Sequence, residues 1–149
     1  MASIYKHILV ATDGTELASK AVEQAGALAR LAGADLSVVY VTSAPPTFYA
    51  SEIGWSVPAD IYDEISVGHA KMAQQIFDNA DKLAGVPIKQ TVHIEDSGAA
   101  EGILEAAQKV GADLIVMASH GHRGIDRLIL GSQAARVLSH STLPVLIVK

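Results

Sequence analysis

Two short loops contain the residues that could bind an anion. One is Ala11-Thr12-Asp13-Gly14-Thr15-Glu16 and the other is Met117-Ala118-Ser119-His120-Gly121, and each follows an apolar run. Nine residues after the second loop, Gly131-Ser132 opens a segment with helical periodicity. Glycine permits close approach of a ligand to the backbone, and the first turn of a helix presents free N–H groups that suit phosphate. These loops therefore predict an anion site, in which Ser132 can act as the helix N-cap and as a hydroxyl donor to the anion.

Asp13 has two interpretations at the end of the first apolar run. Its carboxylate can cap the helix that begins near Glu16. It can also accept hydrogen bonds from ribose hydroxyls, because ligands of open parallel sheets bind beyond the carboxyl ends of the strands. The two roles are compatible, and both remain open on the sequence alone.

The common nucleotide fingerprints are absent from these loops. No Lys follows Gly131 as a P-loop requires, and Gly14 is the only glycine of the first loop, so a dinucleotide fingerprint is missing. Ser119-His120 offers an alternative, a small hydrolase, but no helix begins directly after Ser119 as a nucleophile elbow requires. His120 and His122 have no nearby acidic or Cys companion, which argues against a metal site.

The elements that position these loops alternate along the chain. Apolar runs predict strands, and segments with a 3.6-residue period predict helices between them. Such an order predicts an α/β fold with a mostly parallel sheet and helices on both faces. The expected strands are Tyr5–Thr12, Asp35–Val41, Pro87–Ile94, Leu114–Ala118 and Pro144–Val148, and the expected helices are Glu16–Leu31, Asp60–Ala84, Ala99–Val110 and one from Ser132 to before Pro144.

Two of the expected strands have the character of sheet edges. Polar and apolar residues alternate along Pro87–Ile94, as on an edge strand with one solvated face. The last strand, Pro144–Val148, is apolar throughout, and a bare apolar edge invites pairing with another chain. We therefore expect a homodimer joined through Pro144–Val148.

The connection from Thr42 to about Ala59 is long for a compact domain. It contains three prolines and three of the seven aromatic residues, Phe48, Tyr49 and Trp55. Loops of this length are typically lids, binding segments or disordered segments. Either a lid over a ligand or a loop held to the surface by its aromatic residues is compatible with this composition.

Length and charge restrict the class of protein. The chain of 149 residues has no Cys and a net charge of −5, so we expect one domain over residues 1–149 without disulfides. It shows no signal peptide and no apolar run of about 18 residues, and we expect a cytoplasmic protein that binds neither membrane nor nucleic acid. Residues 117–149 carry four basic residues and one acidic residue, a net +3 that leaves −8 for the rest. The basic part contains Gly121, Gly131 and Ser132.

Three segments in order resemble the universal stress protein family. They are Ala112-Asp113-Leu114-Ile115-Val116-Met117-Ala118-Ser119-His120-Gly121, then after nine residues Gly131-Ser132, and finally Pro144-Val145-Leu146-Ile147-Val148. In addition, His7-Ile8-Leu9-Val10-Ala11-Thr12-Asp13-Gly14 is similar to the family's opening strand and acidic turn, so the resemblance covers the whole chain. It implies a Rossmann-like, five-stranded parallel sheet and a dimer joined through the last strand.

The resemblance also implies one of two branches of the family. The ATP-binding branch has the pattern G-x-x-G, nine residues, G-[ST], and the other branch lacks it. Gly121, Gly131 and Ser132 fit the pattern, whereas Ala118 replaces the first glycine. By this resemblance Asp13 would hold the ribose and Arg123 and Arg127 would assist a polyphosphate unless they are merely solvated. The remaining implied contacts are Ala11, Val41 and Met117 to the adenine, and Gly121, Gly131, Ser132 and Gln133 to the phosphates.

We therefore expect a stress-response protein that binds ATP, or else AMP or ADP, with or without Mg²⁺. It would act as a nucleotide-dependent regulatory or interaction module for an unidentified protein partner. At most slow ATP hydrolysis is expected, because no Lys, acidic pair or water-activating base gathers around Gly131-Ser132. The alternative is a nucleotide-free member of the family that acts only through protein contacts.

Overall fold

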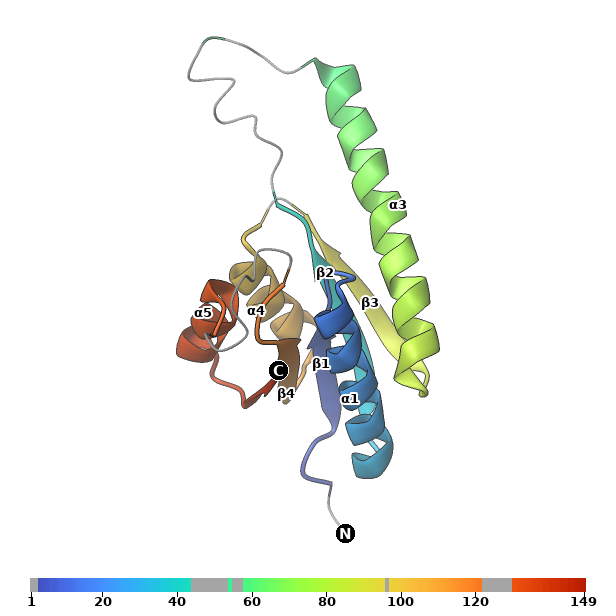
Figure 1. The fold of residues 1–149 in the computed structure, drawn as a ribbon, viewed down its shortest axis with the longest axis vertical. Coiled ribbons are helices and arrows are strands. Elements are labelled where there is room, and N and C mark those ends of the chain that lie inside the picture. Colours follow the sequence, from blue (N-terminus) through green and yellow to red (C-terminus); the bar gives the residue numbers. More distant parts are fainter. Residues whose placement is uncertain (1–2, 44–53, 55–57, 96, 122–129) are drawn as a thin grey trace.

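The structure is a computed structural model that describes residues 3–43, 54, 58–95, 97–121 and 130–149. Strands and helices alternate along the chain (Figure 1). The strands are β1 (His7–Ala11), β2 (Asp35–Val41), β3 (Ile88–Ile94), β4 (Leu114–Ala118) and β5 (Val145–Val148). The helices are α1 (Glu16–Ala32), α3 (Ala59–Ala84), α4 (Ala99–Val110) and α5 (Ser132–His140).

All five strands belong to one parallel sheet with the order β3-β2-β1-β4-β5. This order confirms the predicted α/β class and places β3 and β5 at the edges. β1 lies in the middle, where Val10 pairs with Val38 of β2 and with Val116 of β4. The chain leaves β1 toward β2 and β3, and later returns to the other side of β1 to form β4 and β5. The strand order thus reverses between β1 and β4.

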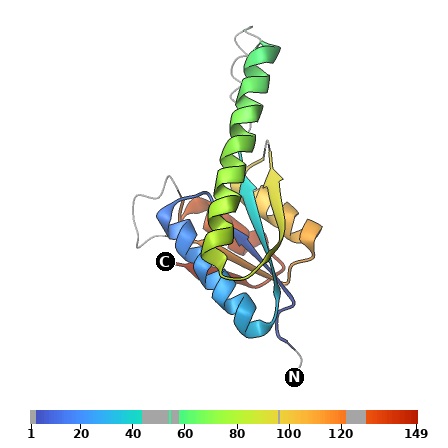
Figure 2. The same cartoon turned by 90° about the vertical axis from the view of Figure 1, so that its right-hand side faces the viewer.

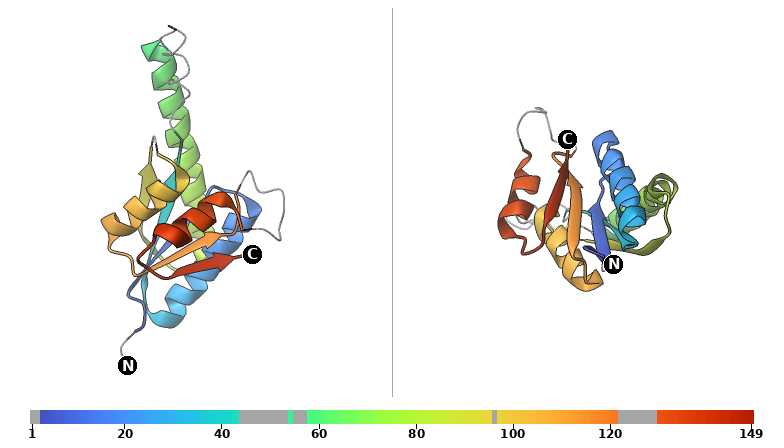
Figure 3. Two further views of the ribbon diagram at one scale, coloured as in Figure 1. Left: turned by 90° about the vertical axis from the view of Figure 1, so that its left-hand side faces the viewer. Right: turned by 90° about the horizontal axis from the view of Figure 1, so that it is seen from below.

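Helices cover both faces of the sheet, as Figure 3 shows in the view from below. The residues of β1 alternate between the two cores. Ile8 and Val10 pack with the buried alanines of α1 and α3, whereas Leu9 packs with Ile115 and the buried faces of α4 and α5. A continuous apolar run was the only pattern that could serve two buried faces.

The helix α3 packs on the sheet over only part of its length. Met72, near its middle, is 48% exposed. The buried residues of α3 begin at Ala73. The preceding half of the helix extends past the ends of the strands (Figure 2). Periodicity gives the apolar side of a helix but not the position at which the sheet beneath it ends.

Within the described parts of the chain, none of the helices combines the length and apolar character that crossing a membrane requires. The long connection from Thr42 to about Ala59, expected to be either a lid or a loop held to the surface, lies mostly outside the described residues, because residues 44–53 and 55–57 are not among them. Phe48, Tyr49 and Trp55 belong to that part, and their expected roles stay predictions.

Candidate functional site

A cavity of about 450 Å³ opens where the strand order reverses, at the carboxyl ends of β1 and β4. This is the position at which open α/β sheets bind ligands, and its volume lies in the usual range for small-molecule sites. All nine residues predicted from the sequence line it. They are Ala11, Asp13, Val41, Met117, Ala118, Gly121, Gly131, Ser132 and Gln133.

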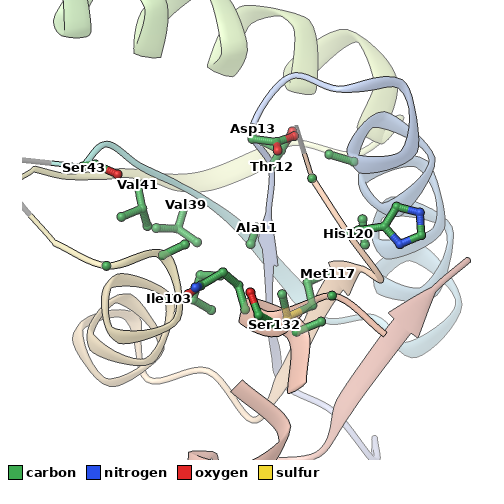
Figure 4. A pocket seen from close by; sticks show the side chains of 18 residues that line it. Ala11, Thr12, Asp13, Val39, Val41, Ser43, Ile103, Met117, His120 and Ser132 are labelled. Carbon is green, nitrogen blue, oxygen red and sulfur yellow. The ribbon is translucent and has the colours of Figure 1, made fainter. Parts of the chain in front are cut away.

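The cavity has an apolar side and a polar rim. In Figure 4, Val39, Val41 and Ile103 lie together on one side, while Asp13 lies above the end of β1 and Ser132 lies across the cavity from it. Met117 contributes its thioether side chain near the floor. A flat apolar group and a polar, anionic group can therefore occupy different parts of the same cavity.

Asp13 is fixed by the turn that precedes α1. Its Oδ1 accepts hydrogen bonds from the Thr15 backbone N–H at 3.0 Å and from the Thr15 hydroxyl at 2.6 Å. Thr15, not Asp13, is the N-cap, since its Oγ1 accepts from the Ala18 N–H at 3.3 Å. The expectation that Asp13 caps the helix directly is thus wrong: Asp13 orients the capping residue. Gly14, between them, has φ +81°, which favours glycine at the turn.

Two glycines permit the close approach of the loops around the cavity. A Cβ on Gly121 would collide with Oδ2 of Asp13, so glycine at 121 lets the second loop lie against that carboxylate. A Cβ on Gly131 would lie 2.7 Å from the carbonyl oxygen of Ser119, which accepts the Gly131 N–H at 2.8 Å. The loop after β4 and the start of α5 are therefore in direct backbone contact.

Gly131 is the N-cap of α5 and Ser132 is its first helical residue. The expectation that Ser132 caps the helix is therefore wrong. No side chain of the cap residue satisfies the first N–H groups of α5, and these groups carry the positive end of the helix dipole at the cavity. The Ser132 side chain lies at the cavity beside them (Figure 4).

Gln133 lines the cavity and also connects two helices. Its Oε1 accepts the N–H of Ala100, in the first turn of α4, at 3.0 Å. Arg136 of α5 forms an ion pair with Glu101 of α4 at 2.8 Å. These two interactions connect the start of α4 to the start of α5. The side-chain oxygen of Gln133 already accepts a hydrogen bond within the protein.

The charge around the cavity differs from what the basic end of the sequence suggested. Arg136 is paired with Glu101, and Arg123 and Arg127 lie outside the described residues. Among the described lining residues, Asp13 is the only carboxylate, and no Lys or Arg is present. The polar groups of these described lining residues are backbone N–H groups, hydroxyls, and the side chains of Asp13, His120 and Gln133.

The structure supports only part of the hydrolase alternative: Ser119 is close enough to His120 for a hydrogen bond, but its side chain is not exposed to a substrate. Ser119 Oγ lies 3.1 Å from His120 Nδ1. However, Ser119 is 2% exposed and is absent from the residues that line the cavity. The regions described contain no group of three His, Cys, Asp or Glu residues arranged to hold a metal.

Sequence reasoning missed a further part of the cavity wall. Gly98 and Ala99, at the start of α4, line it together with Val39 and Ile103. The rule that ligands lie beyond the carboxyl ends of strands applies equally to the β3–α4 loop, and it could have found Gly98. Tyr40, on β2, is half-buried, and this burial raises its pKa, with the charge of Asp13 acting in the same direction.

Comparisons with known proteins identify the family and support the fold. The model of the universal stress protein family matches residues 4–149. Universal stress protein YxiE of Bacillus subtilis is 34% identical over 148 residues, which cover 98% of this chain and 100% of that protein. The solved structure of hypothetical protein MJ0577 is 27% identical, with a TM-score of 0.77 and coverage of 98% of this chain and 96% of that one. A universal stress protein solved in complex with cAMP is 27% identical, with a TM-score of 0.64 and 97% coverage of both chains. The chain belongs to the universal stress protein family.

Proposed function

We propose that this protein binds an adenine nucleotide, ATP first among them, in the cavity between β1 and β4. The observation that carries the proposal is the convergence of all nine predicted residues on one cavity at the switch point of the sheet. A family relative that was solved with cAMP supports the adenine nucleotide as the ligand class.

The lining divides by chemistry into three parts that suit the three parts of a nucleotide. Ala11, Val41 and Met117 offer apolar surface for the adenine. The carboxylate of Asp13, held in place through the bond from the Thr15 N–H to its Oδ1, is the group we assign to the ribose hydroxyls. The start of α5 supplies backbone N–H groups to the phosphates, which suit an anion at a helix N-terminus.

The residues at the start of α5 take different parts in this proposal. Gly131 brings the backbone N–H groups close, and Ser132 adds a hydroxyl donor. Gln133 can donate its amide NH₂ to a phosphate while its side-chain oxygen accepts from the N–H of Ala100. Ala118 is 8% exposed and lies at the cavity, so its methyl group fits in the folded cavity wall where the family pattern has glycine. Mg²⁺, where it accompanies ATP, would be held by the phosphates.

Titration calorimetry with ATP, ADP, AMP and cAMP, each with and without Mg²⁺, tests the proposal. Asp13→Asn retains the Oδ1 acceptor for Thr15 but replaces the second oxygen with a donor. Hydrogen bonds to charged groups contribute about 1.5–3 kcal/mol, so we expect affinity to fall roughly 10- to 150-fold. Asp81→Asn removes the same charge from an exposed site on α3 and should bind like the unmodified protein.

Two results would contradict the assignment. Equal affinity of Asp13→Asn and the unmodified protein would remove Asp13 from the ribose site. Absence of heat with every nucleotide, in protein whose fold is verified by circular dichroism, would favour the nucleotide-free alternative. In that case the protein would act through contacts with other proteins alone.

We also propose that two copies pair through β5. This strand has one neighbour in the sheet, β4, and Leu146 is 38% exposed. An apolar edge strand of this kind is covered in native proteins. Light scattering at micromolar concentration should report a dimer for the unmodified protein, and Leu146→Lys should shift it toward monomer. A monomer at all concentrations would refute the pairing.

A further inference from the structure

The amino-terminal half of α3 carries an apolar stripe with an exposed residue at each end and the partly buried Ile65 between them. Ile61, Ile65, Gly68 and Met72 follow one another at intervals of four, three and four residues, which is the a/d spacing of a coiled-coil seam. Ile61 is 42% exposed and Met72 is 48% exposed. We call these four residues the α3 seam.

The α3 seam stands clear of the rest of the described molecule. Residues on the core side of α3 are buried only from Ala73 onward. Figures 1 and 2 show the earlier turns extending past the ends of the strands. Residues 61–72 span about 18 Å at 1.5 Å per residue. A second helix can therefore lie along them without meeting the sheet.

Gly68 lies in the middle of the α3 seam, and its lack of a side chain favours one direction of a partner helix over the other. A Cβ at this position would meet nothing within 4 Å, so no packing inside the molecule requires glycine here. Glycine costs an exposed helix roughly 1 kcal/mol relative to alanine. A parallel partner would place Gly68 opposite Gly68 and leave a gap, whereas an antiparallel partner places Ile65 of one helix over Gly68 of the other.

The charges beside the seam select the same arrangement. Glu64 and Lys71 are seven residues apart, both in the g positions that flank the seam on one side, and both are exposed. Neither forms an ion pair within the described part of the chain. In an antiparallel pair of identical helices, g positions face g positions. With Ile65 over Gly68, Glu64 of each copy faces Lys71 of the other, and two ion pairs form.

We propose that two copies of this protein associate through the α3 seam as an antiparallel helix pair. The two-fold axis passes near residues 66 and 67, and the layers are Ile61 with Met72 and Ile65 with Gly68. Two segments of about 18 Å bury less than a standard interface, so the contact is weak by itself. Combined with a second two-fold contact elsewhere on the chain, it would join dimers into larger closed or open assemblies.

A charge-exchange experiment tests both the pairing and its direction. Glu64→Lys leaves Lys facing Lys in a self-pair, and Lys71→Glu leaves Glu facing Glu. Sedimentation velocity over 10–500 µM should show self-association about tenfold weaker in each variant than in the unmodified protein at low salt. An equimolar mixture of the two variants should regain association, because every Lys then faces a Glu. Lys109→Glu on α4, which makes the same charge change as Lys71→Glu, serves as the control for that variant and should associate normally.

Engineered thiols give a second readout that does not depend on affinity, because the chain has no Cys. Ile61→Cys mixed with Met72→Cys should form a disulfide between the two variants under mild oxidation. Each variant alone should form none, since residue 61 faces residue 72. Leu31→Cys, exposed on α1, mixed with either variant is the matched control and should not cross-link.

The two experiments can each overturn the proposal. Loss of association in the mixture of charge variants, or association unaffected by either single variant, would refute the 64–71 pairing. A disulfide formed by Ile61→Cys with itself would show a parallel pair instead. None of these residues lines the cavity, so the outcome is independent of nucleotide binding.

Discussion

Replacing Gly131 with alanine adds one methyl group at the contact between the loop after β4 and the start of α5. The backbone at Gly131 has φ −60° and ψ 152°, which alanine adopts without strain. The cost is therefore purely one of space. The new Cβ would lie 2.7 Å from the Ser119 carbonyl oxygen and 3.2 Å from the Cβ of His120.

The expected loss of stability depends on how far the Ser119 carbonyl oxygen has to move to make room for the new methyl group. An ordinary contact requires the carbonyl oxygen to retreat by roughly half an ångström or more, and it belongs to the main chain, so no side chain can rotate away. Overpacking of this kind costs about 1–3 kcal/mol, while alanine restricts the unfolded chain and returns about 0.4–1 kcal/mol. We expect a net loss of about 1–2 kcal/mol, and a melting temperature about 2–8 °C lower for a chain of this length.

Urea unfolding followed by far-UV circular dichroism measures the stability, and calorimetry with ATP measures the second effect. The displacement separates the Gly131 N–H from the Ser119 oxygen, now 2.8 Å away, and shifts the start of α5 at the proposed phosphate site. Affinity for ATP should fall together with stability.

Gly68→Ala provides the matched control for this substitution. Its new methyl group would meet nothing within 4 Å, so measured at low protein concentration it should raise stability by about 0.5–1 kcal/mol. If Gly131→Ala were as stable as Gly68→Ala and bound ATP unchanged, the reasoning from backbone contact would be refuted.

Gly26→Ala on α1 should destabilise by about 2 kcal/mol or more, because its Cβ would collide with the Ala84 carbonyl at the end of α3; a urea midpoint at or above that of the unmodified protein would contradict this. His7 gives a pH dependence. Burial chiefly lowers its pKa below 6.5, and the nearby charge of Lys89 acts in the same direction, against Asp35 and Asp113. The unfolded chain therefore binds a proton first as pH falls below about 6.5, and stability should decrease toward pH 5. His7→Gln should flatten this slope in unfolding curves between pH 7 and 5, and an unchanged slope would exclude His7 as its source.

The parts of the fold that the sequence predicted well are those decided by local pattern. The bounds of β2, α4 and β4 agree with the prediction, since each apolar or periodic run is closed by glycine or polar residues. β1 is shorter than the expected Tyr5–Thr12, although Thr12 still donates its N–H to the Val39 carbonyl at 3.0 Å. Strand ends depend on the neighbouring strand, which a single run does not contain.

The candidate cavity was predictable because strand ends meet at one edge of a parallel sheet. The hydrogen bonds within the cavity were harder to predict. Gln133 was expected only as a phosphate donor, but its oxygen accepts from Ala100, 33 residues away in the sequence. Likewise, Ser132 and Asp13 suit a helix cap by type, and the caps proved to be Gly131 and Thr15. Which residue becomes the N-cap depends on tertiary geometry, because several suitable residues lie near one helix end and only one takes the cap position.

The central position of β1 has a consequence for the synthesis of the chain. β1 emerges from the ribosome before the other strands of this sheet, and β2 covers one of its edges soon afterwards. The other edge waits for β4, about 100 residues later, which corresponds to roughly 5–20 s at ordinary elongation rates. During that interval the apolar run Ile8-Leu9-Val10 has an open hydrogen-bonding edge beside it. The nascent chain has to protect that edge from other chains until residues 114–118 arrive.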